Sequence, residues 1–370
     1  MQIVLFYHSL ISDWNHGNAH FLRGVVSELL VQGHLVEVYE PRDAWSVENL
    51  LREPQGEQAL EGFKQAYPGL VSNRYDRTTL ELDRVLEKAD LVLVHEWNEP
   101  SLVQKVGEHR ARTGHYKLLF HDTHHRSVTD QASMAAYDLR HYDGALVFGA
   151  VIRDIYLQKG WLQPVWTWHE AADTRVFQPL PEVENQGDLV WIGNWGDDER
   201  SAELHEFLVR PVQELGLKAR IYGVRYPTQV QRTLKLAGIE YSGWLPNYAA
   251  PQVFAQYKVT VHVPRRPYVK ALPGIPTIRI FEALACGIPL VSAPWEDVEG
   301  LFSPGEDFLV ARNETEMCQK LRLVLSNKPR AQELAARGLE TILKRHTCIH
   351  RVDELLNIYR ELTNGKVTST

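Results

Sequence analysis

The fold of the second half of the chain is decided by the stretch Ala271-Leu-Pro-Gly-Ile-Pro-Thr-Ile-Arg-Ile-Phe-Glu-Ala-Leu-Ala-Cys-Gly-Ile-Pro-Leu-Val-Ser292. Its prolines and Gly274 predict a loop, residues 277–286 a helix that the next glycine ends, and residues 288–292 a strand. A helix that leads directly into an apolar strand is the repeating unit of α/β proteins with parallel sheets. We therefore expect a parallel sheet around this stretch.

Two charged residues give this helix a second role beyond packing. Arg279 and Glu282 are three positions apart and share one face, opposite an apolar side. The helix dipole and Arg279 would hold a phosphate, and Glu282 would accept hydrogen bonds from ribose hydroxyls. An ordinary surface ion pair at this spacing is the alternative, and the residue types alone leave both interpretations open.

Length, composition and charge limit the class of protein. At 370 residues the chain exceeds what one hydrophobic core usually supports, so we expect two domains. The apolar fraction of 44% and the charged fraction of 24% are typical of globular proteins. The chain has 40 Lys and Arg against 47 Asp and Glu, which gives a net charge of -7, whereas domains that bind nucleic acid usually have an excess of basic residues. We therefore expect no nucleic-acid partner.

Cysteine usage and the N-terminus bear on the compartment. Cys286, Cys318 and Cys348 are odd in number and far apart, which indicates reduced thiols. The first residues resemble a β-strand more than a signal peptide, and no apolar run reaches the roughly 20 residues that cross a bilayer. We expect a cytoplasmic protein without a transmembrane segment. The sequence leaves the oligomeric state open, and a homodimer is compatible with it.

Apolar runs of strand length alternate with amphipathic runs of helix length in both halves of the chain, which predicts an α/β fold with two Rossmann-like, doubly wound parallel sheets. The expected strands are residues 3–7, 35–39, 90–95, 117–121, 144–148, 188–192, 218–222, 239–242, 259–263, 288–292 and 308–311. Residues 41–79 have no readable pattern. A segment rich in Trp and Pro, residues 161–181, leads into the boundary between a first domain over 1–175 and a second over 188–345.

In open parallel sheets, ligands bind beyond the carboxyl ends of the strands, so the loops there are candidate sites. His16, Gly17 and Asn18 open the first helix, where a glycine and unpaired backbone N–H groups suit a phosphate or a sugar hydroxyl. A turn that merely caps the helix is the alternative. The loop does not have the spacing G-x-G-x-x-G, so we do not expect a nicotinamide cofactor.

Titratable side chains follow two further strands, in His95-Glu-Trp-Asn98 and in His121-Asp-Thr-His-His-Arg126. A partly desolvated carboxylate or imidazole at a strand end can act as a general base. Three histidines in the second loop also admit a metal, but close spacing does not by itself give converging ligands, and we expect none. Hydrogen bonding to the backbone is the alternative for each histidine.

Glycines also follow three strands of the second half. A glycine there admits a diphosphate or a base closely, and an apolar ring can lie against a nucleobase. The candidate residues of these loops for binding such a ligand are Gly193, Asn194, Gly223, Arg225, Trp244 and Leu245. For Trp244, packing in the core is the alternative.

The run Arg279-Ile-Phe-Glu-Ala-Leu-Ala-Cys-Gly287 resembles the nucleotide-sugar-binding signature of group 1 glycosyltransferases with the GT-B fold. The nearest branch is the family similar to spore maturation protein CgeB, in which the pattern R-x-F-E-A-x-A-x-G recurs. Three further stretches agree with this resemblance: residues 17–23, residues 172–179 and residues 346–356.

The resemblance implies two domains that face a cleft, with a nucleotide sugar held by the C-terminal domain and an unknown acceptor by the N-terminal domain. Glu282 would bind ribose, Arg279 and the backbone near Gly274 the diphosphate, while Trp244 and Leu245 would flank the base. It further implies that the last segment, residues 346–370, is a helix that returns to the first domain. A UDP-sugar is the preferred donor, and neither a metal nor a separate cofactor is expected, because cations and a helix dipole stabilise the departing diphosphate.

One position departs from the pattern of this family. Many retaining members have a carboxylate eight positions before the ribose-binding Glu, where this chain has Gly274. The departure favours an inverting hexosyltransferase with a base from the N-terminal domain, for which we choose Asp122 or His121, followed by His16 and His124. A sugar-nucleotide epimerase on the same fold and a non-catalytic sugar- or nucleotide-binding module remain the alternatives.

Overall fold

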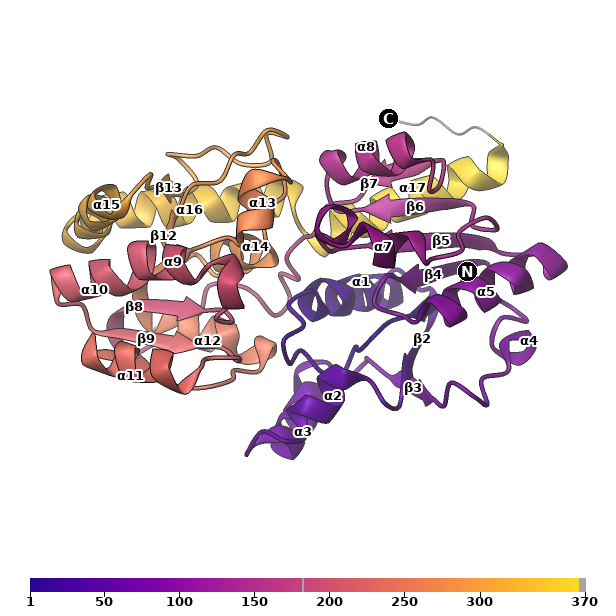
Figure 1. Ribbon diagram of the computed structural model, residues 1–370, viewed down its shortest axis with the longest axis horizontal. Coiled ribbons are helices and arrows are strands. Elements are labelled where there is room, and N and C mark those ends of the chain that lie inside the picture. The colour runs from indigo at the N-terminus through magenta and orange to yellow at the C-terminus, as the bar shows by residue number, and fades with distance from the viewer. Residues whose placement is uncertain (182, 366–370) are drawn as a thin grey trace. The chain divides into compact units, whose positions relative to one another are not determined.

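The computed structural model describes residues 1–181 and 183–365, and the chain divides into two compact units (Figure 1). Unit 1 comprises Met1–Glu170 and the C-terminal segment from Cys348, and unit 2 comprises Ala171–Thr347. The units thus divide at residue 170, earlier than the limit of 175 expected from the sequence. The end of the expected third segment, residues 366–370, lies outside the described residues.

Unit 1 contains a seven-stranded parallel sheet in the order β3-β2-β1-β4-β5-β6-β7. Its strands are β1 (Gln2–Phe6), β2 (Leu35–Pro41), β3 (Ser72–Tyr75), β4 (Leu91–His95), β5 (Lys117–Asp122), β6 (Gly144–Val147) and β7 (Val165–Thr167). Its helices are α1 (Ala19–Val31), α2 (Trp45–Leu50), α3 (Gly56–Ala66), α4 (Leu82–Val85), α5 (Pro100–Thr113), α6 (Arg126–Thr129), α7 (Gln131–Ala135), α8 (Ala150–Lys159) and α17 (Cys348–Asn364).

Helix α17 belongs to unit 1. It packs on α1, and the carbonyl of Arg351 accepts a hydrogen bond from Trp168 Nε1 at 2.8 Å. Trp168 is fully buried, so this bond ties the end of the chain to the core of the first sheet.

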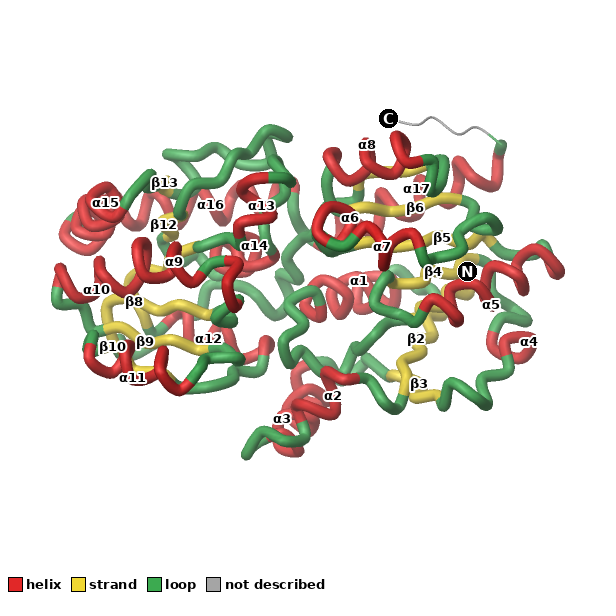
Figure 2. Tube along the Cα trace, viewed as in Figure 1, coloured by secondary structure: helices red, strands yellow, loops and turns green. Residues whose placement is uncertain are grey.

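Unit 2 contains a six-stranded parallel sheet in the order β10-β9-β8-β11-β12-β13, flanked by helices (Figure 2). Its strands are β8 (Gly187–Ile192), β9 (Ala219–Tyr222), β10 (Ile239–Tyr241), β11 (Tyr257–His262), β12 (Leu290–Ser292) and β13 (Leu309–Val310). Its α-helices are α9 (Ser201–Leu204), α10 (Arg210–Leu215), α11 (Thr228–Leu236), α12 (Ala250–Ala255), α13 (Arg266–Lys270), α14 (Ile278–Ala285), α15 (Glu314–Ser326) and α16 (Lys328–Arg345). The prediction of two doubly wound parallel sheets is confirmed.

Helix α14 follows the prediction for residues 277–286 to within one residue at each end, because local signals set both limits. Thr277 is its N-cap, and Gly287, with a φ of 65°, takes the left-handed conformation that ends a helix. Seven of its eight residues are buried and Arg279 is the exception, so the helix is held mainly by burial of apolar side chains.

Three details of unit 1 differ from the prediction. The unreadable stretch 41–79 contains α2, α3 and β3. Helical spacing predicts a helix over 132–140, but α7 ends at Ala135. The short helix α6 precedes it, and the side chain of Asp130 between the two caps α7 by accepting from Ser133 N. The segment of Trp and Pro residues contributes the edge strand β7, which pairs with β6.

No helix among the described residues is long and apolar enough to span a bilayer.

Candidate functional site

Helix α14 brings a cation and a carboxylate to the carboxyl edge of the unit 2 sheet. Arg279 and Glu282 form an ion pair across one helical turn, with their side chains 19% and 0% exposed. Asn247, in the loop before α12, donates from Nδ2 to Glu282 Oε1 at 2.6 Å. The pair is therefore largely buried and differs from the exposed surface pair of the alternative interpretation.

His262, at the end of β11, fixes the N-terminus of α14. Its Nδ1 shares a hydrogen bond with Ser292 Oγ at 2.9 Å, and its Nε2 shares one with Thr277 Oγ1 at 3.1 Å. Burial, followed by the nearby charges of Arg200 and Arg279, lowers the pKa of His262 to about 3. The imidazole is therefore neutral at physiological pH, and it joins two strand ends to the helix N-cap.

A second cation of this edge, Arg200, was not among the residues predicted from the sequence. Its guanidinium donates to the carbonyl oxygens of Asn194, Trp195 (3.4 Å) and Val263 (3.1 Å), and it lies 5.1 Å from the ring centroid of Trp191. These carbonyls lie beyond the ends of β8 and β11, so the side chain spans two neighbouring strands. No local motif marks Arg200, because its partners are set by the tertiary fold.

Three guanidinium groups act on one another at this edge. Burial first, and then the charges of Arg265 and Arg279, lower the pKa of Arg200 to about 9. Arg265 in turn pairs with Glu199 at 2.7 Å. Like charges gathered in a partly desolvated site are costly unless an anion compensates them, and phosphate oxygens are the acceptors that arginine matches best.

The glycines that follow β8 and β9 are required by close packing of the two loops. A Cβ on Gly223, whose φ is 151°, would lie 2.0 Å from the carbonyl oxygen of Gly193. A Cβ on Gly193 would lie 2.7 Å from the Trp191 ring. Asn194 joins the same two loops, because its Oδ1 accepts from Val224 N at 3.0 Å. Arrangement of the loops therefore accounts for these residues without a ligand.

The other loop residues of unit 2 are more exposed. Trp244 and Leu245 are half-buried, so Trp244 is not a core residue. Arg225 has a φ of 62° and pairs with Asp197 at 2.7 Å, with both side chains about half exposed.

Gly274 lies beside a carboxylate. Its φ is 90°, and a Cβ at this position would lie 2.9 Å from Glu299 Cγ and 3.0 Å from Glu299 Oε1. The Glu299 side chain thus occupies the space that a larger residue at 274 would need. Gly274 is the position at which the family resemblance expects a carboxylate, and here a carboxylate from the loop after β12 stands next to it.

In unit 1, the strand ends bring buried histidines together on one face of the sheet. His95 and His121 are register partners on β4 and β5, and their ring centroids are 5.3 Å apart. His16 lies 6.1 Å from His95 and 5.7 Å from His8. Burial lowers the pKa of each, to about 3 for His121 and about 4 for His8, and well below the ordinary value for His16 and His95.

Asp122 lies on the opposite face, because side chains alternate along a strand. It is fully buried, its Oδ2 accepts from Tyr156 Oη at 2.9 Å, and its Oδ1 accepts from His124 N at 3.1 Å. Burial raises its pKa to about 6 and that of neighbouring Glu96 to about 8. Glu96 pairs with Arg126.

Of the remaining predicted residues of unit 1, one is exposed at the surface and the others make contacts within the unit. Gly17 is exposed at the start of α1, and Asn18 uses its side-chain amide to donate to Thr123 of the loop after β5 instead of capping its own helix. His124 contacts Trp97, whereas His121 packs on Trp168 with centroids 4.8 Å apart. The rings of His124 and His125 also contact each other, with centroids 4.0 Å apart, so His121 is the histidine of this stretch that has a different neighbour.

Similarity to known proteins agrees with this architecture. Residues 200–357 match the family model described as "Glycosyl transferase-like". Sucrose-phosphate synthase from Thermosynechococcus elongatus is 14% identical with a TM-score of 0.65, and the match covers 99% of this chain and 100% of that chain. Anabaena HepE in complex with UDP and glucose is 13% identical with a TM-score of 0.68, covering 98% and 100%.

The chain has the GT-B fold. An α-glucosyltransferase in complex with UDP has the same architecture, with 11% identity, a TM-score of 0.69 and coverage of 97% and 100%. No curated protein sequence matches the chain. The segment that matches the family model contains Arg200, Asn247, Arg279 and Glu282 of unit 2, of which Asn247 and Glu282 are buried. The last part of the matched segment, which ends at residue 357, extends into α17 of unit 1.

Proposed function

We propose that this chain is a glycosyltransferase that moves a hexose from a nucleotide diphosphate donor, preferably a UDP-sugar, to an acceptor hydroxyl without a metal. The observation that carries the proposal is that the charges of Arg265 and Arg279 act on Arg200 and that Arg279 pairs with the buried Glu282, all within the segment that resembles glycosyl transferases. Cations suit the diphosphate, and a carboxylate suits vicinal ribose hydroxyls. The complexes of HepE and of the α-glucosyltransferase with UDP support the choice of nucleotide.

Each residue then has a defined role toward the donor. Arg279 binds a phosphate oxygen at the N-terminus of α14, and Arg200 adds positive charge that stabilises the leaving diphosphate. Glu282, held by Asn247, accepts from the ribose hydroxyls. Trp244, half-buried beyond β10, lies against the base, with Leu245 beside it.

For the base that activates the acceptor, we favour His16 over Asp122 and His121. Its side chain is 4% exposed, and its Nε2 has no hydrogen-bond partner among the described residues. The lowered pKa keeps the imidazole uncharged at neutral pH, so a ring nitrogen can accept a hydrogen bond from the acceptor hydroxyl. Asp122 is already engaged by Tyr156 and by the backbone of His124, which suits a positioning role.

The R-x-F-E-A-x-A-x-G pattern at residues 279–287 further supports a place in the CgeB-like branch, and we propose a cytoplasmic location and an inverting outcome. Release of UDP from a panel of UDP-sugars tests the assignment, with and without candidate acceptors. UDP release that depends on an acceptor and falls tenfold or more in Glu282→Ala supports it. Failure of UDP and of every UDP-sugar to bind the folded protein would overturn it. Conversion of UDP-N-acetylglucosamine without acceptor or UDP release would instead indicate an epimerase.

A further inference from the structure

Four half-buried aromatic side chains form a continuous row at the carboxyl edge of the unit 1 sheet. This aromatic row consists of Trp14, Trp45, Trp97 and His124. Trp14, Trp97 and His124 lie in the loops after β1, β4 and β5, and Trp45 is the first residue of α2, which follows β2. Neighbouring ring centroids are 6.3, 6.2 and 4.9 Å apart, with interplanar angles of 77°, 69° and 74°. The four strands are adjacent in the sheet, so the row crosses its centre.

Each indole of the aromatic row is fixed by a further contact. Trp14 donates from Nε1 to Glu53 Oε1 at 2.7 Å. Trp45 stacks on buried His8 with centroids 4.7 Å apart and an interplanar angle of 27°. The guanidinium of Arg126 lies 4.6 Å from the ring centroid of Trp97. Because these contacts hold the rings before any ligand arrives, binding to them costs little side-chain entropy.

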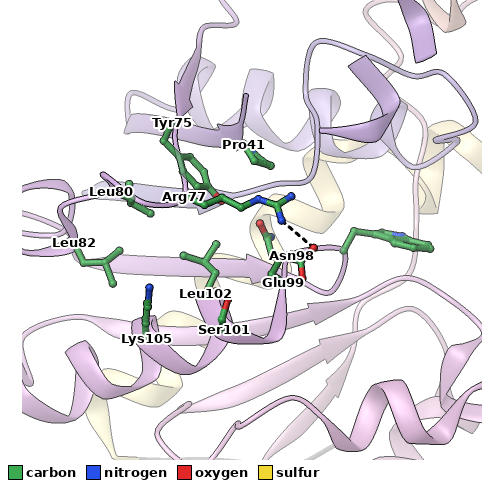
Figure 3. A pocket seen from close by; sticks show the side chains of 11 residues that line it. Pro41, Tyr75, Arg77, Leu80, Leu82, Asn98, Glu99, Ser101, Leu102 and Lys105 are labelled. Atoms are coloured by element: carbon green, nitrogen blue, oxygen red, sulfur yellow. Dashed lines mark ion pairs between the residues drawn. The ribbon is translucent and has the colours of Figure 1, made fainter. Parts of the chain in front are cut away.

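Charged and polar groups border the aromatic row. Trp97 lines a pocket together with Arg77, Glu99 and Lys105 (Figure 3). Arg77 pairs with Glu99 at 3.0 Å and with Asp43 at 3.1 Å, and the first of these pairs is drawn in the figure. All three partners are exposed by more than a third, so they can exchange water for ligand hydroxyls.

Hydrogen-bonding capacity is also left unused beneath the row. Nε2 of His8 and Nε2 of His16 are buried and have no hydrogen-bond partner among the described residues. Buried polar atoms without partners are uncommon in folded proteins, and at a site they indicate a ligand or an ordered water. His8 stacks directly on Trp45, so this capacity adjoins the aromatic row.

We propose that the aromatic row is a binding platform for a pyranose unit of a carbohydrate acceptor. A pyranose ring has an apolar face of C–H groups, which the negative face of an indole attracts, while its equatorial hydroxyls reach outward to polar partners. The row supplies the indoles, and the charged border and the histidine nitrogens supply the hydrogen bonds. The assignment rests on the proposed function, since it names the acceptor class of the same enzyme.

The charged border distinguishes a carbohydrate from a lipid chain. An acyl chain laid along the row would strip water from Arg77, Glu99 and Asp43 and give them no hydrogen bonds in return, which is unfavourable. A sugar replaces that water with hydroxyl groups.

The test measures carbohydrate binding and UDP binding separately on the full-length protein. Binding is screened on a broad panel of immobilised glycans and on vesicles of phosphatidylglycerol, and UDP binding is followed by calorimetry. Trp45→Ala and Trp97→Ala are compared with Trp161→Ala, a half-buried tryptophan in the loop before β7, at the opposite edge of the sheet. Trp45→Phe, which keeps a ring, is the conservative variant.

We expect the wild type to bind one class of glycan, Trp45→Ala and Trp97→Ala to weaken that binding tenfold or more, and Trp45→Phe and Trp161→Ala to retain most of it. UDP affinity should stay within twofold of the wild type in all variants that unfold at the same temperature. The platform is overturned by the absence of glycan binding, by binding of vesicles alone, or by alanine variants that bind as the wild type does. Absence of UDP binding would instead contradict the proposed glycosyltransferase function, whatever the result of the glycan screen.

Discussion

The ion pair between Arg279 and Glu282 offers the sharpest test of the donor site. Replacing Arg279 by Ala leaves the fully buried Glu282 carboxylate without its ion-pair partner. Breaking a buried pair in this way costs about 3 to 5 kcal/mol, and we expect the lower end because the arginine side chain is 19% exposed. Removing both side chains should cost less than the sum of the two single changes, because neither charge is then stranded.

Effects on the donor are separable from effects on stability. A hydrogen bond to a charged group contributes about 1.5 to 3 kcal/mol, which corresponds to a loss of UDP affinity of roughly ten- to one-hundred-fold in Arg279→Ala and in Glu282→Ala. Arg337→Ala is the matched control, since Arg337 pairs with Glu340 at the same helical spacing with side chains 56% and 48% exposed. We would measure urea denaturation for stability and calorimetry for UDP, at a temperature at which every variant is folded.

The reasoning is refuted if folded Arg279→Ala and Glu282→Ala bind UDP as tightly as the control does. The pair would then be a structural element of α14, and the diphosphate would have to bind elsewhere. A cost in stability below about 1 kcal/mol for the single changes would refute the burial argument instead, because that value is typical of exposed pairs.

Three further predictions concern stability and are measured by urea denaturation. Burial raises the pKa of Glu96 to about 8, so between its ordinary value and 8 the folded state keeps a proton that the unfolded state has lost. Stability should therefore fall by roughly 1 kcal/mol as the pH rises from 7 to 8, and Glu96→Gln should flatten that slope. Gly274→Ala should cost about 1 to 2 kcal/mol through its positive φ and its contact with Glu299, and combining it with Glu299→Ala should recover part of that cost; an additive double variant would contradict the contact. Gly223→Ala should destabilise by more than Gly274→Ala, since its Cβ would meet the carbonyl of Gly193 at 2.0 Å, and a neutral effect would show that the two loops move apart freely.

The sequence predicts elements whose limits are set by nearby residues. The limits of α14 follow from the prolines before it and from Gly287 after it, and the parallel sheets follow from the alternation of apolar strands and amphipathic helices. The same logic fails for the helix predicted over 132–140, since α7 begins after its N-cap Asp130 and ends at Ala135.

Site residues whose positions depend on partners far away in the chain cannot be predicted from local sequence patterns. Arg200 owes its position to carbonyl groups beyond β8 and β11, more than sixty residues apart in the chain for Asn194 and Val263. The indoles of Trp14 and Trp45 meet because β1 and β2 are neighbours, and Trp45 lies in the stretch whose pattern is unreadable. Such residues have no local spacing that would mark them.

The alternation of side chains along β5 decides which groups of unit 1 can act on an acceptor. His121 faces Phe21 of α1 and the other buried histidines, whereas Asp122, the next residue, faces Tyr156 of α8. Burial disfavours the charged form of both side chains, so it lowers the pKa of His121 to about 3 and raises the pKa of Asp122 to about 6. At neutral pH the histidine face therefore offers uncharged imidazoles that can accept a hydrogen bond from an acceptor hydroxyl, and His16 and His8 on that face lead directly to Trp45 of the aromatic row. A base chosen from this face adjoins the proposed acceptor platform at Trp45, whereas Asp122 meets the platform at the backbone N–H of His124, to which one of its carboxylate oxygens is already bound.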